Sequence, residues 1–316
     1  MGTPLIETKD LKKYFNTPKG DLHAVDNVNL TINRGQTLGV VGESGCGKST
    51  LGRTILRLLE PTSGEILYEG ENILNYDSNK MNKMRQKMQI IFQDPYSSLN
   101  PRMTVNEIIA EPIKVCKTIK NKNDINDKVL ELMEVVGLAE RFVNAYPHEL
   151  DGGRRQRIGI ARALALEPEF IVCDEPVSAL DVSIQAQILN LMMDLQDEIG
   201  LTYMFITHDL SVVKHISNEI AVMYLGQVVE KAPSDELFNN PLHPYTKALL
   251  DAIPIPKLNS NNSLKNIIKG EVTSPINPKP GCRFYTRCPV SKKECIAGNI
   301  ALKKVSGEHF VACTLF

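Results

Sequence analysis

Residues 42 to 50 combine glycines, a lysine and two hydroxyl side chains at the spacing G-x-x-x-x-G-K-[ST], which is typical of a phosphate-binding loop. The apolar run 37–41 before the loop predicts a buried strand, and residues 49–59 after it predict a helix. Glycine permits the tight turn, and backbone N–H groups and the helix N-terminus attract an anion. The predicted nucleotide-binding residues of the loop are Gly42, Ser44, Gly45, Cys46, Gly47, Lys48, Ser49 and Thr50.

Two of these side chains carry the chemistry. Lys48 is expected to bind the β and γ phosphates, and the hydroxyl of Ser49 is expected to bind Mg²⁺. A glycine-rich turn can match the pattern by accident, but the strand and the helix around it favour an ATP or GTP site. The motif alone indicates a nucleotide and not a function.

A pair of carboxylates follows a second buried strand, predicted at residues 170–173. Asp174 is expected to hold Mg²⁺, usually through water, and Glu175 to orient or deprotonate the attacking water. A solvated acidic pair that caps a helix is the alternative. The phosphate loop in the same chain favours the catalytic interpretation.

The elements that must position these residues alternate between helix and strand. Predicted helices at about 78–87, 152–166 and 182–198 are followed by predicted strands at 88–92, 170–173 and 202–206. This order predicts a mainly parallel sheet whose ligands bind at the carboxyl ends of the strands. Residues 4–41 alternate in a pattern that predicts an antiparallel layer, and residues 104–143 have helical spacing that indicates an insertion.

Further motifs occur in a fixed order around the two carboxylates. They are Gln93 after an apolar strand, the loop 150–157, the run Ser178-Ala179-Leu180-Asp181, and His208 after the strand 202–206. The set resembles the ATP-binding subunit of ABC transporters over about residues 4–252. The resemblance implies ATPase activity and an α/β fold: a P-loop NTPase core of mainly parallel sheet, with an antiparallel β subdomain and a helical subdomain at about 94–165.

The same resemblance implies roles for individual residues. Gln93 would contact Mg²⁺ and the attacking water, and would sense the membrane subunit through the loop 94–102. His208 would contact the γ-phosphate, and Asp181 would couple the two halves of a dimer. By themselves, a histidine after a strand and an aromatic residue at a strand end are more often structural.

An aromatic residue near the N-terminus is expected to stack on adenine. Phe15 aligns with the stacking residue of the family, and Tyr14 is the alternative. An ordinary core role is the competing interpretation for either ring.

The signature loop departs from the Leu-Ser-Gly-Gly-Gln of the family. Asp151 replaces the serine and Arg154 replaces the glutamine, around Gly152 and Gly153. Two unit charges 4 Å apart interact by about 1 kcal/mol in water and about 4 kcal/mol at an effective dielectric near 20, so Asp151 would disfavour a phosphate while Arg154 could offset it. We expect a heterodimer with a paralogous ATPase subunit that has an ordinary signature loop; a tolerated variant without kinetic effect is the alternative.

Composition limits the class of protein. The 316 residues have a net charge of −1, which gives no general attraction to nucleic acid. No stretch reaches the roughly 18 apolar residues of a membrane span, and residues 1–16 lack the apolar core of a signal peptide. The chain is therefore expected to stay in the cytosol, where thiols are usually reduced. The resemblance implies a peripheral subunit at the cytoplasmic face of the membrane.

Four of the seven cysteines lie near the C-terminus, at Cys282, Cys288, Cys295 and Cys313. They follow a predicted linker, 253–269, in a segment, 270–316, that resembles the Cys-rich C-terminal domain of oligopeptide and dipeptide transporter ATPases. The resemblance implies a [4Fe–4S] cluster, and all-Cys clusters tolerate varied spacing. Zinc lacks its usual close cysteine pair here and stays an alternative, as do free thiols.

These features together favour the ATPase of an ABC importer for di- or oligopeptides. Its expected partners are the paralogous ATPase subunit, two integral membrane permease subunits and, indirectly, an extracytoplasmic solute-binding protein. A nickel or metal-chelate importer has the same resemblance. A soluble ABC ATPase acting on DNA or ribosomes would need a second ATPase unit, a long coiled coil or a basic surface. The intact Glu175 argues against a non-hydrolysing regulator.

Overall fold

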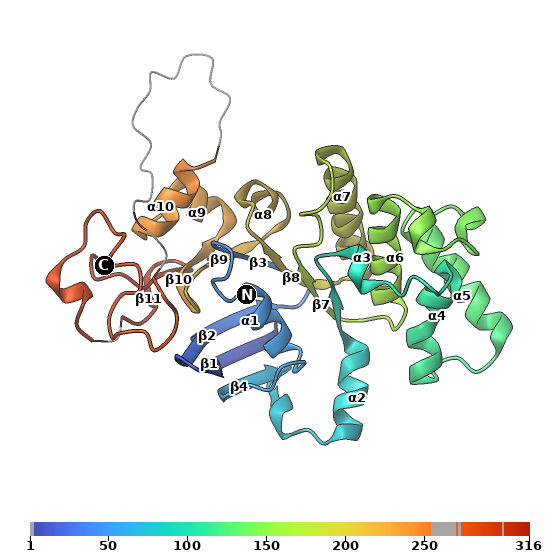
Figure 1. Cartoon of the computed structure of the whole chain (residues 1–316), viewed down its shortest axis with the longest axis horizontal. Coiled ribbons are helices and arrows are strands. Elements are labelled where there is room, and N and C mark those ends of the chain that lie inside the picture. Colours follow the sequence, from blue (N-terminus) through green and yellow to red (C-terminus); the bar gives the residue numbers. More distant parts are fainter. Residues whose placement is uncertain (1–2, 254–269, 271–272, 299) are drawn as a thin grey trace, which may run out of the picture. The chain divides into compact units, whose positions relative to one another are not determined.

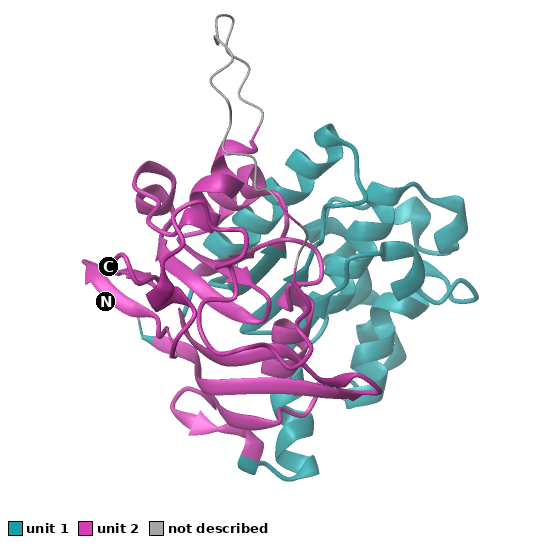
Figure 2. Cartoon of the chain, turned by 60° about the vertical axis from the view of Figure 1, so that its left-hand side comes forward, with its two compact units in different colours: residues 1–3, 33–36, 75–206 teal, residues 4–32, 37–74, 207–316 magenta. Residues whose placement is uncertain are grey.

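The computed structural model describes residues 3–253, 270, 273–298 and 300–316. The chain forms two compact units, which Figure 2 shows in two colours: unit 1 contains residues 1–3, 33–36 and 75–206, and unit 2 contains residues 4–32, 37–74 and 207–316. All but one residue of the predicted linker, 253–269, lies outside the described residues. The domain boundaries at 252 and 270 therefore stay predictions.

Unit 2 contains the antiparallel layer that residues 4–41 predict. Its strand order is β2-β1-β4-β5, with β1 antiparallel to β4. The strands are β1 (Pro4–Thr17), β2 (Gly20–Asn33), β4 (Ser63–Tyr68) and β5 (Glu71–Asn72). In β2 the side chains of Val28, Leu30 and Ile32 are all buried, as the two-residue period of a strand with one face on a core requires.

A second group of strands in unit 2 carries the phosphate loop. In the order β11-β12-β10-β9-β3, β3 and β9 run parallel, whereas β9 and β10, β10 and β12, and β12 and β11 run antiparallel. The strands are β3 (Thr37–Val41), β9 (Glu219–Tyr224), β10 (Gln227–Pro233), β11 (Lys303–Ser306) and β12 (His309–Val311). All five residues of β3 are buried, which explains its continuous apolar run.

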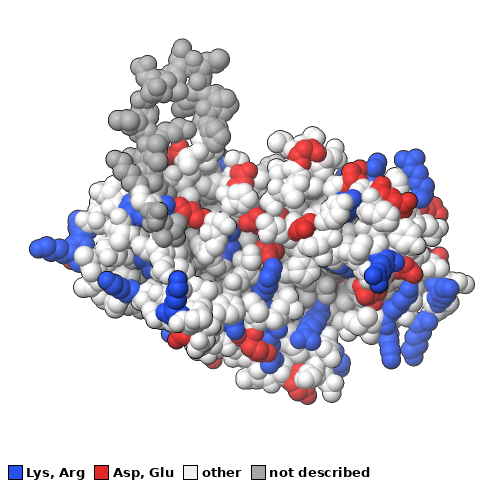
Figure 3. All heavy atoms as spheres, in the orientation of Figure 1, with Lys and Arg blue, Asp and Glu red and all other residues white. Residues whose placement is uncertain are grey.

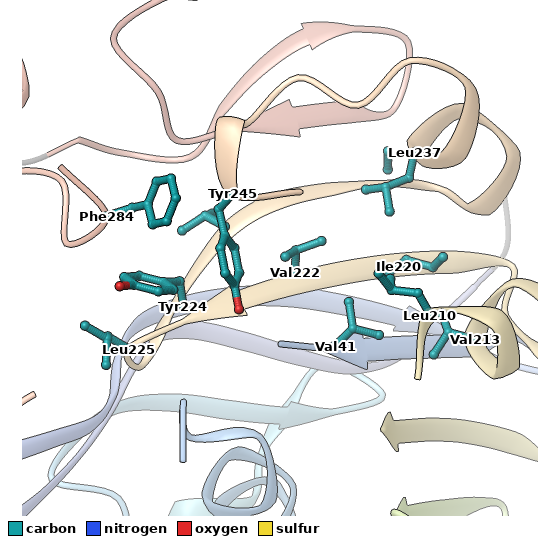
Figure 4. Packing of buried hydrophobic residues seen from close by; sticks show 12 residues of the cluster. Val41, Leu210, Val213, Ile220, Val222, Tyr224, Leu225, Leu237, Tyr245 and Phe284 are labelled. Carbon is teal, nitrogen blue, oxygen red and sulfur yellow. The ribbon is translucent and has the colours of Figure 1, made fainter. Parts of the chain in front are cut away.

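The helices of unit 2 are α1 (Lys48–Ile55), α8 (Leu210–Ile216), α9 (Ser234–Asn239) and α10 (Pro244–Asp251), labelled in Figure 1. A core of this unit brings Val41 together with Val222, Tyr224 and Tyr245, and Phe284 from the C-terminal segment belongs to the same cluster (Figure 4). The phosphate loop, between β3 and α1, therefore starts from a buried strand of this core.

Unit 1 has three parallel strands in the order β8-β7-β6. They are β6 (Met88–Ile91), β7 (Phe170–Asp174) and β8 (Thr202–Thr207), each within one residue of the prediction. The helices are α2 (Ser78–Lys87), α3 (Pro95–Ser98), α4 (Val105–Cys116), α5 (Lys122–Val135), α6 (Gly152–Leu164) and α7 (Val182–Ile199). The predicted insertion 104–143 thus contains two α-helices and a 3-10 turn at Glu140–Phe142, and both α4 and α5 pack against α6. The predicted α/β fold class is confirmed.

Candidate functional site

The phosphate loop in unit 2 needs glycine at both ends. A Cβ atom on Gly42, at φ +156°, would lie 2.2 Å from the carbonyl oxygen of Met223. A Cβ on Gly47, at φ +107°, would lie 2.0 Å from the carbonyl oxygen of Ala24. Backbone carbonyls cannot move aside as a flexible side chain can, so any larger residue at these positions would displace the loop. Gly47 is also the N-cap of α1, and Ser44 and Gly45 lie exposed between the two positions.

Lys48 is held by the loop itself. Its side chain is buried, and its Nζ donates to the carbonyl oxygens of Gly42 at 2.8 Å and Glu43 at 3.1 Å. The Sγ of Cys46 lies 4.0 Å from the same nitrogen, and burial raises the pKa of that thiol. A buried cation beside the N-terminus of a helix is suited to bind phosphate. Ser49 and Thr50 follow in the first turn of α1.

The aromatic residues of β1 differ in their surroundings. The Tyr14 ring stacks on His23 with centroids 3.8 Å apart, and its hydroxyl donates to Asp26. Burial opposes ionisation of Asp26, but the hydrogen bond from Tyr14 and the Arg283 cation hold its pKa below the usual value. Phe15 is half-buried, and the Nζ of Lys13 lies 4.9 Å from its ring centroid. Tyr14 is therefore engaged within the protein, so Phe15 stays the first candidate for adenine.

His208 follows β8 at the start of unit 2's last segment and is exposed. The turn that presents it is fixed by its neighbours, because the Thr207 hydroxyl accepts the N–H of Asp209, and Asp209 caps α8 by accepting the N–H of Ser211.

In unit 1 the two carboxylates lie at the carboxyl end of β7. Asp174 is 1% exposed and Glu175 is half-buried. Glu175 has φ +50°, a left-handed conformation that is costly for a residue with a Cβ, and its N–H donates to the Ile206 carbonyl at 2.9 Å. Gln93, exposed after β6, donates its amide to Oε2 of Glu175 at 2.9 Å. The structure thus brings together the amide and the carboxylate that were predicted to act on the same water.

In the signature loop, also in unit 1, the two residues that depart from the family pattern contact each other. Asp151 is the N-cap of α6, and its Oδ1 accepts the N–H of Arg154 at 2.8 Å. The Arg154 side chain turns back and donates to Oδ2 of Asp151 at 2.6 Å. Gly153 is required by packing, since a Cβ there would lie 2.7 Å from a methyl carbon of Ile184 in α7, while one on Gly152 would meet Leu180 at 3.1 Å. The introduced charges therefore compensate each other within the loop.

Asp181 is the N-cap of α7. Its Oδ1 accepts the Ser183 hydroxyl at 2.7 Å and the Ile184 N–H at 3.0 Å, and these hydrogen bonds, that of Ser183 above all, lower its pKa. The residue is ionised and fixed, as a contact between subunits would need, and its coupling role stays a prediction.

The four C-terminal cysteines line one cavity of about 10 Å³, together with Phe284, Thr314 and others. Burial raises the pKa of Cys282 to about 11 and also raises the pKa values of Cys288 and Cys313. Cys282, Cys288 and Cys313 are thus thiols, which a metal would have to deprotonate. Among the described residues, no three His, Cys, Asp or Glu side chains are close enough together to hold a metal ion.

Sequence reasoning missed one cluster beside the phosphate loop. The N–H of Glu43 donates to the Tyr245 hydroxyl at 2.9 Å, and the Glu43 carboxylate accepts both terminal nitrogens of Arg287. Glu43 occupies a variable position of the motif and Arg287 stands between cysteines, so neither had a recognisable pattern of its own. Position inside the motif was the only available signal.

Two family models match the chain. The model described as ABC transporter matches residues 25–178, and the model of the oligopeptide/dipeptide transporter C-terminal region matches residues 229–295.

Similarity to several transport ATP-binding proteins extends over nearly the whole chain. The oligopeptide transport ATP-binding protein AppF of Bacillus subtilis is 51% identical, over 99% of this chain and 97% of its own. The oligopeptide transport protein OppF of Salmonella typhimurium is also 51% identical (98% and 92%), and the dipeptide transport protein DppF of Haemophilus influenzae is 50% identical (98% and 96%). Among solved structures, a dimeric ATP-binding cassette bound to ADP and Pi superposes with a TM-score of 0.67 at 31% identity, over 73% of this chain and 99% of that chain.

Proposed function

This chain belongs to the family of ATP-binding proteins of oligopeptide and dipeptide ABC transporters, and from that premise we propose that it hydrolyses ATP to drive the import of di- or oligopeptides. The observation that carries the proposal is the contact between the Gln93 amide and the Glu175 carboxylate in unit 1, in a chain whose phosphate loop in unit 2 is complete. Unit 1 thus contains the two groups proposed to act on water, and unit 2 contains the groups proposed to act on phosphate.

The roles in hydrolysis follow from the chemistry of each side chain. Lys48 would bind the β and γ phosphates, and Ser49, Gln93 and Asp174 would hold Mg²⁺ directly or through water, which would neutralise charge on the phosphates. Glu175 is the general base or orienting group for the attacking water. His208 stabilises the γ-phosphate, and Phe15 stacks on adenine.

We further propose a heterodimer with a paralogous ATPase whose signature loop is ordinary. The Asp151–Arg154 pair supports this, because a carboxylate stands where the family has a serine and the Arg154 guanidinium is paired with that carboxylate. The pair is about half exposed, and such exposed ion pairs contribute only about 0–1 kcal/mol. We therefore propose that the altered loop weakens, without abolishing, the ATP site that it forms with the partner's phosphate loop. The proposal fails if the purified chain, as its own dimer, hydrolyses ATP as fast as the reconstituted two-subunit complex.

The four cysteines are proposed to hold a [4Fe–4S] cluster. The proposal rests on the sequence resemblance of this segment, because the four thiols, all in the described part of the chain, line one cavity but no three of them lie close enough together to hold a metal ion. A cluster would add a redox-active group to the C-terminal segment. Anaerobically purified protein should then be brown, with a broad absorbance in the blue part of the visible range. Colourless protein containing stoichiometric zinc would favour the zinc alternative, and colourless protein without metal would indicate free thiols.

The proposed partners are two permease subunits at the membrane, contacted through the loop 94–102 after Gln93, and indirectly a solute-binding protein. In the described part of the chain, no helix is long and apolar enough to cross a membrane. On the face drawn in Figure 3, basic and acidic side chains are interspersed, which does not favour a nucleic-acid partner.

Affinity purification of this chain from its native membrane, followed by identification of the associated proteins, tests the proposal. We expect a second ATPase and two integral membrane proteins. A nickel-binding or chelate-binding partner would contradict the peptide substrate, and recovery only with DNA or ribosomes would contradict transport.

A further inference from the structure

Two arginines of the C-terminal segment 282–288 reach residues near the nucleotide elements of unit 2. The Arg287 guanidinium donates to both oxygens of Glu43, at 2.8 and 3.0 Å, in the two-pronged geometry that guanidinium and carboxylate groups favour. The side chains are 7% and 25% exposed, so the pair is largely shielded from water.

Glu43 is a fixed point of the phosphate loop. Its N–H donates to Tyr245, its carboxylate accepts Arg287, and its carbonyl accepts Nζ of Lys48 at 3.1 Å. A displacement of Glu43 would therefore move the carbonyl that positions the phosphate-binding lysine. An unpaired carboxylate in this loop would in addition repel a bound phosphate.

The Arg287 side chain is itself held in place. Its Nη1 lies 3.3 Å from the Tyr224 hydroxyl. The rings of Tyr224, Tyr245 and Phe284 pack against one another with centroids 4.7 to 5.3 Å apart, as Figure 4 illustrates. Phe284 thus anchors the segment that carries Arg287 to the core behind the loop.

Arg283 anchors the same segment a second time. It donates to the Leu225 carbonyl and to Asp26, the residue that also accepts the Tyr14 hydroxyl. Because these contacts do not involve Arg287, the segment should stay docked when Arg287 is changed.

We propose that Arg287 is a positioning residue of the nucleotide site: acting through Glu43, it holds the phosphate loop in its binding geometry and compensates the negative charge that this loop carries. The inference rests on the proposed binding of ATP at the phosphate loop. It makes the C-terminal segment part of the nucleotide site, and the stretch that carries Arg287 also carries Cys282 and Cys288.

The test is titration of the full chain with a fluorescent ATP analogue and Mg²⁺. The variants are Arg287→Gln, Arg287→Lys, Glu43→Gln and the double variant Arg287→Gln/Glu43→Gln. We expect Arg287→Gln to raise the Kd about fivefold to tenfold. Arg287→Lys should raise it less, since lysine keeps the positive charge but cannot donate from two nitrogens to both carboxylate oxygens. In the Glu43→Gln background, Arg287→Gln should change the Kd by less than about twofold.

Hydrolysis kinetics of the reconstituted complex give a second readout. Because the loop binds substrate and transition state alike, KM should rise in proportion to Kd while kcat changes little. Arg34→Gln is the matched control, since it removes an arginine from another ion pair, with Glu169 at 2.6 Å in unit 1, and it should leave Kd unchanged.

An unchanged Kd in Arg287→Gln, or an equal loss with and without the Glu43 carboxylate, would overturn the inference. Thermal unfolding beside Arg34→Gln shows whether Arg287→Gln folds. If it does not, the Kd of Arg287→Lys is compared in the wild-type and Glu43→Gln backgrounds, and an unchanged Kd or an equal loss in both would again overturn the inference. A wild-type chain that binds no ATP analogue would instead contradict the proposed function.

Discussion

At the scale of single residues, the carboxylate predicted to activate water stands on a strained backbone. Glu175 has φ +50° and is held there by its N–H bond to Ile206, while its side chain accepts Gln93. A left-handed conformation costs a residue with a side chain on the order of 1–3 kcal/mol, and such positions are common at active sites. The strained backbone fixes the position of the Glu175 carboxylate. The chemistry of this carboxylate can therefore be tested by a substitution that keeps the shape of the side chain.

Glu175→Gln keeps the shape and removes the base. We expect kcat for ATP hydrolysis by the complex to fall about a hundredfold or more, since general bases commonly contribute that much. The Kd for ATP should stay within about twofold of the wild-type value, because the residues of the phosphate loop, which bind the phosphates, are unchanged. Steady-state hydrolysis and analogue binding measure the two quantities, and a Glu175→Gln complex that retains most of its kcat would remove Glu175 from the mechanism.

The paired departures in the signature loop allow a second prediction. In a complex where this chain also carries Glu175→Gln, the remaining hydrolysis comes from the partner's phosphate loop and this chain's signature loop. Restoring that loop with Asp151→Ser/Arg154→Gln should then raise hydrolysis about tenfold, which corresponds to removing about 1.4 kcal/mol of unfavourable interaction. Serine still caps α6, so stability should change little. If the rate does not change, the natural loop is a tolerated variant.

At the residue scale, the motifs predicted where the chemical groups lie along the chain, and their roles stay predictions. Lys48 lies at the start of α1, after the turn that follows β3, and Asp174 and Glu175 lie at the carboxyl end of β7, because motif spacing follows strand–turn–helix geometry. Arg287 and Glu43 lie 244 positions apart, and no local spacing relates them. Such a pair becomes visible only once the chain has folded.

At the scale of elements, polar segments were the hardest to predict. The hairpin of β11 and β12 has the lysines Lys303 and Lys304 in β11, all of which is exposed, so it lacks the apolar alternation that predicts a strand. The division between α4 and α5 was visible in principle, because the stretch 117–121, polar except for Ile119, ends in Asn121, which caps α5. The buried β3 and β7 were unambiguous since every residue in each is buried.

The start of α10 makes stability depend on pH. His243 caps this helix by accepting the Tyr245 N–H on Nδ1, and its burial lowers the pKa to about 4 from an ordinary 6.5. A lowered folded-state pKa contributes stability that is complete above pH 6.5 and is lost as the pH falls towards 4. At 1.36 kcal/mol per pH unit, this loss amounts to up to about 3 kcal/mol.

His243→Asn keeps a good N-cap and removes the titrating ring. Between pH 7.5 and pH 5, the free energy of unfolding of wild type should therefore fall by about 2 kcal/mol more than that of His243→Asn. Urea unfolding at the two pH values measures the difference. Parallel pH dependence of the two proteins would show that His243 does not titrate in this way.

At the scale of the whole molecule, the chemistry is divided. Lys48 and His208 belong to unit 2, whereas Gln93, Glu175 and the signature loop belong to unit 1. The order of motifs predicted the fold class and the family, because the phosphate loop, Gln93, the two carboxylates and His208 each lie at or just after the end of a strand, while the signature loop and Asp181 each begin a helix. The sequence could not show how the C-terminal segment contributes to the nucleotide site, since that depends on the packing of Phe284 and Arg287.

Uptake of a labelled oligopeptide into proteoliposomes tests the central claim most directly. The vesicles would contain the complex of this chain with its paralogous ATPase and two permeases, together with the solute-binding protein. Uptake should require ATP and should fall about a hundredfold or more, together with hydrolysis, when this chain carries Glu175→Gln. Undiminished ATP-dependent uptake by the Glu175→Gln complex, or ATP hydrolysis by the wild-type complex without uptake of any peptide tested, would contradict the claim that this chain drives peptide import.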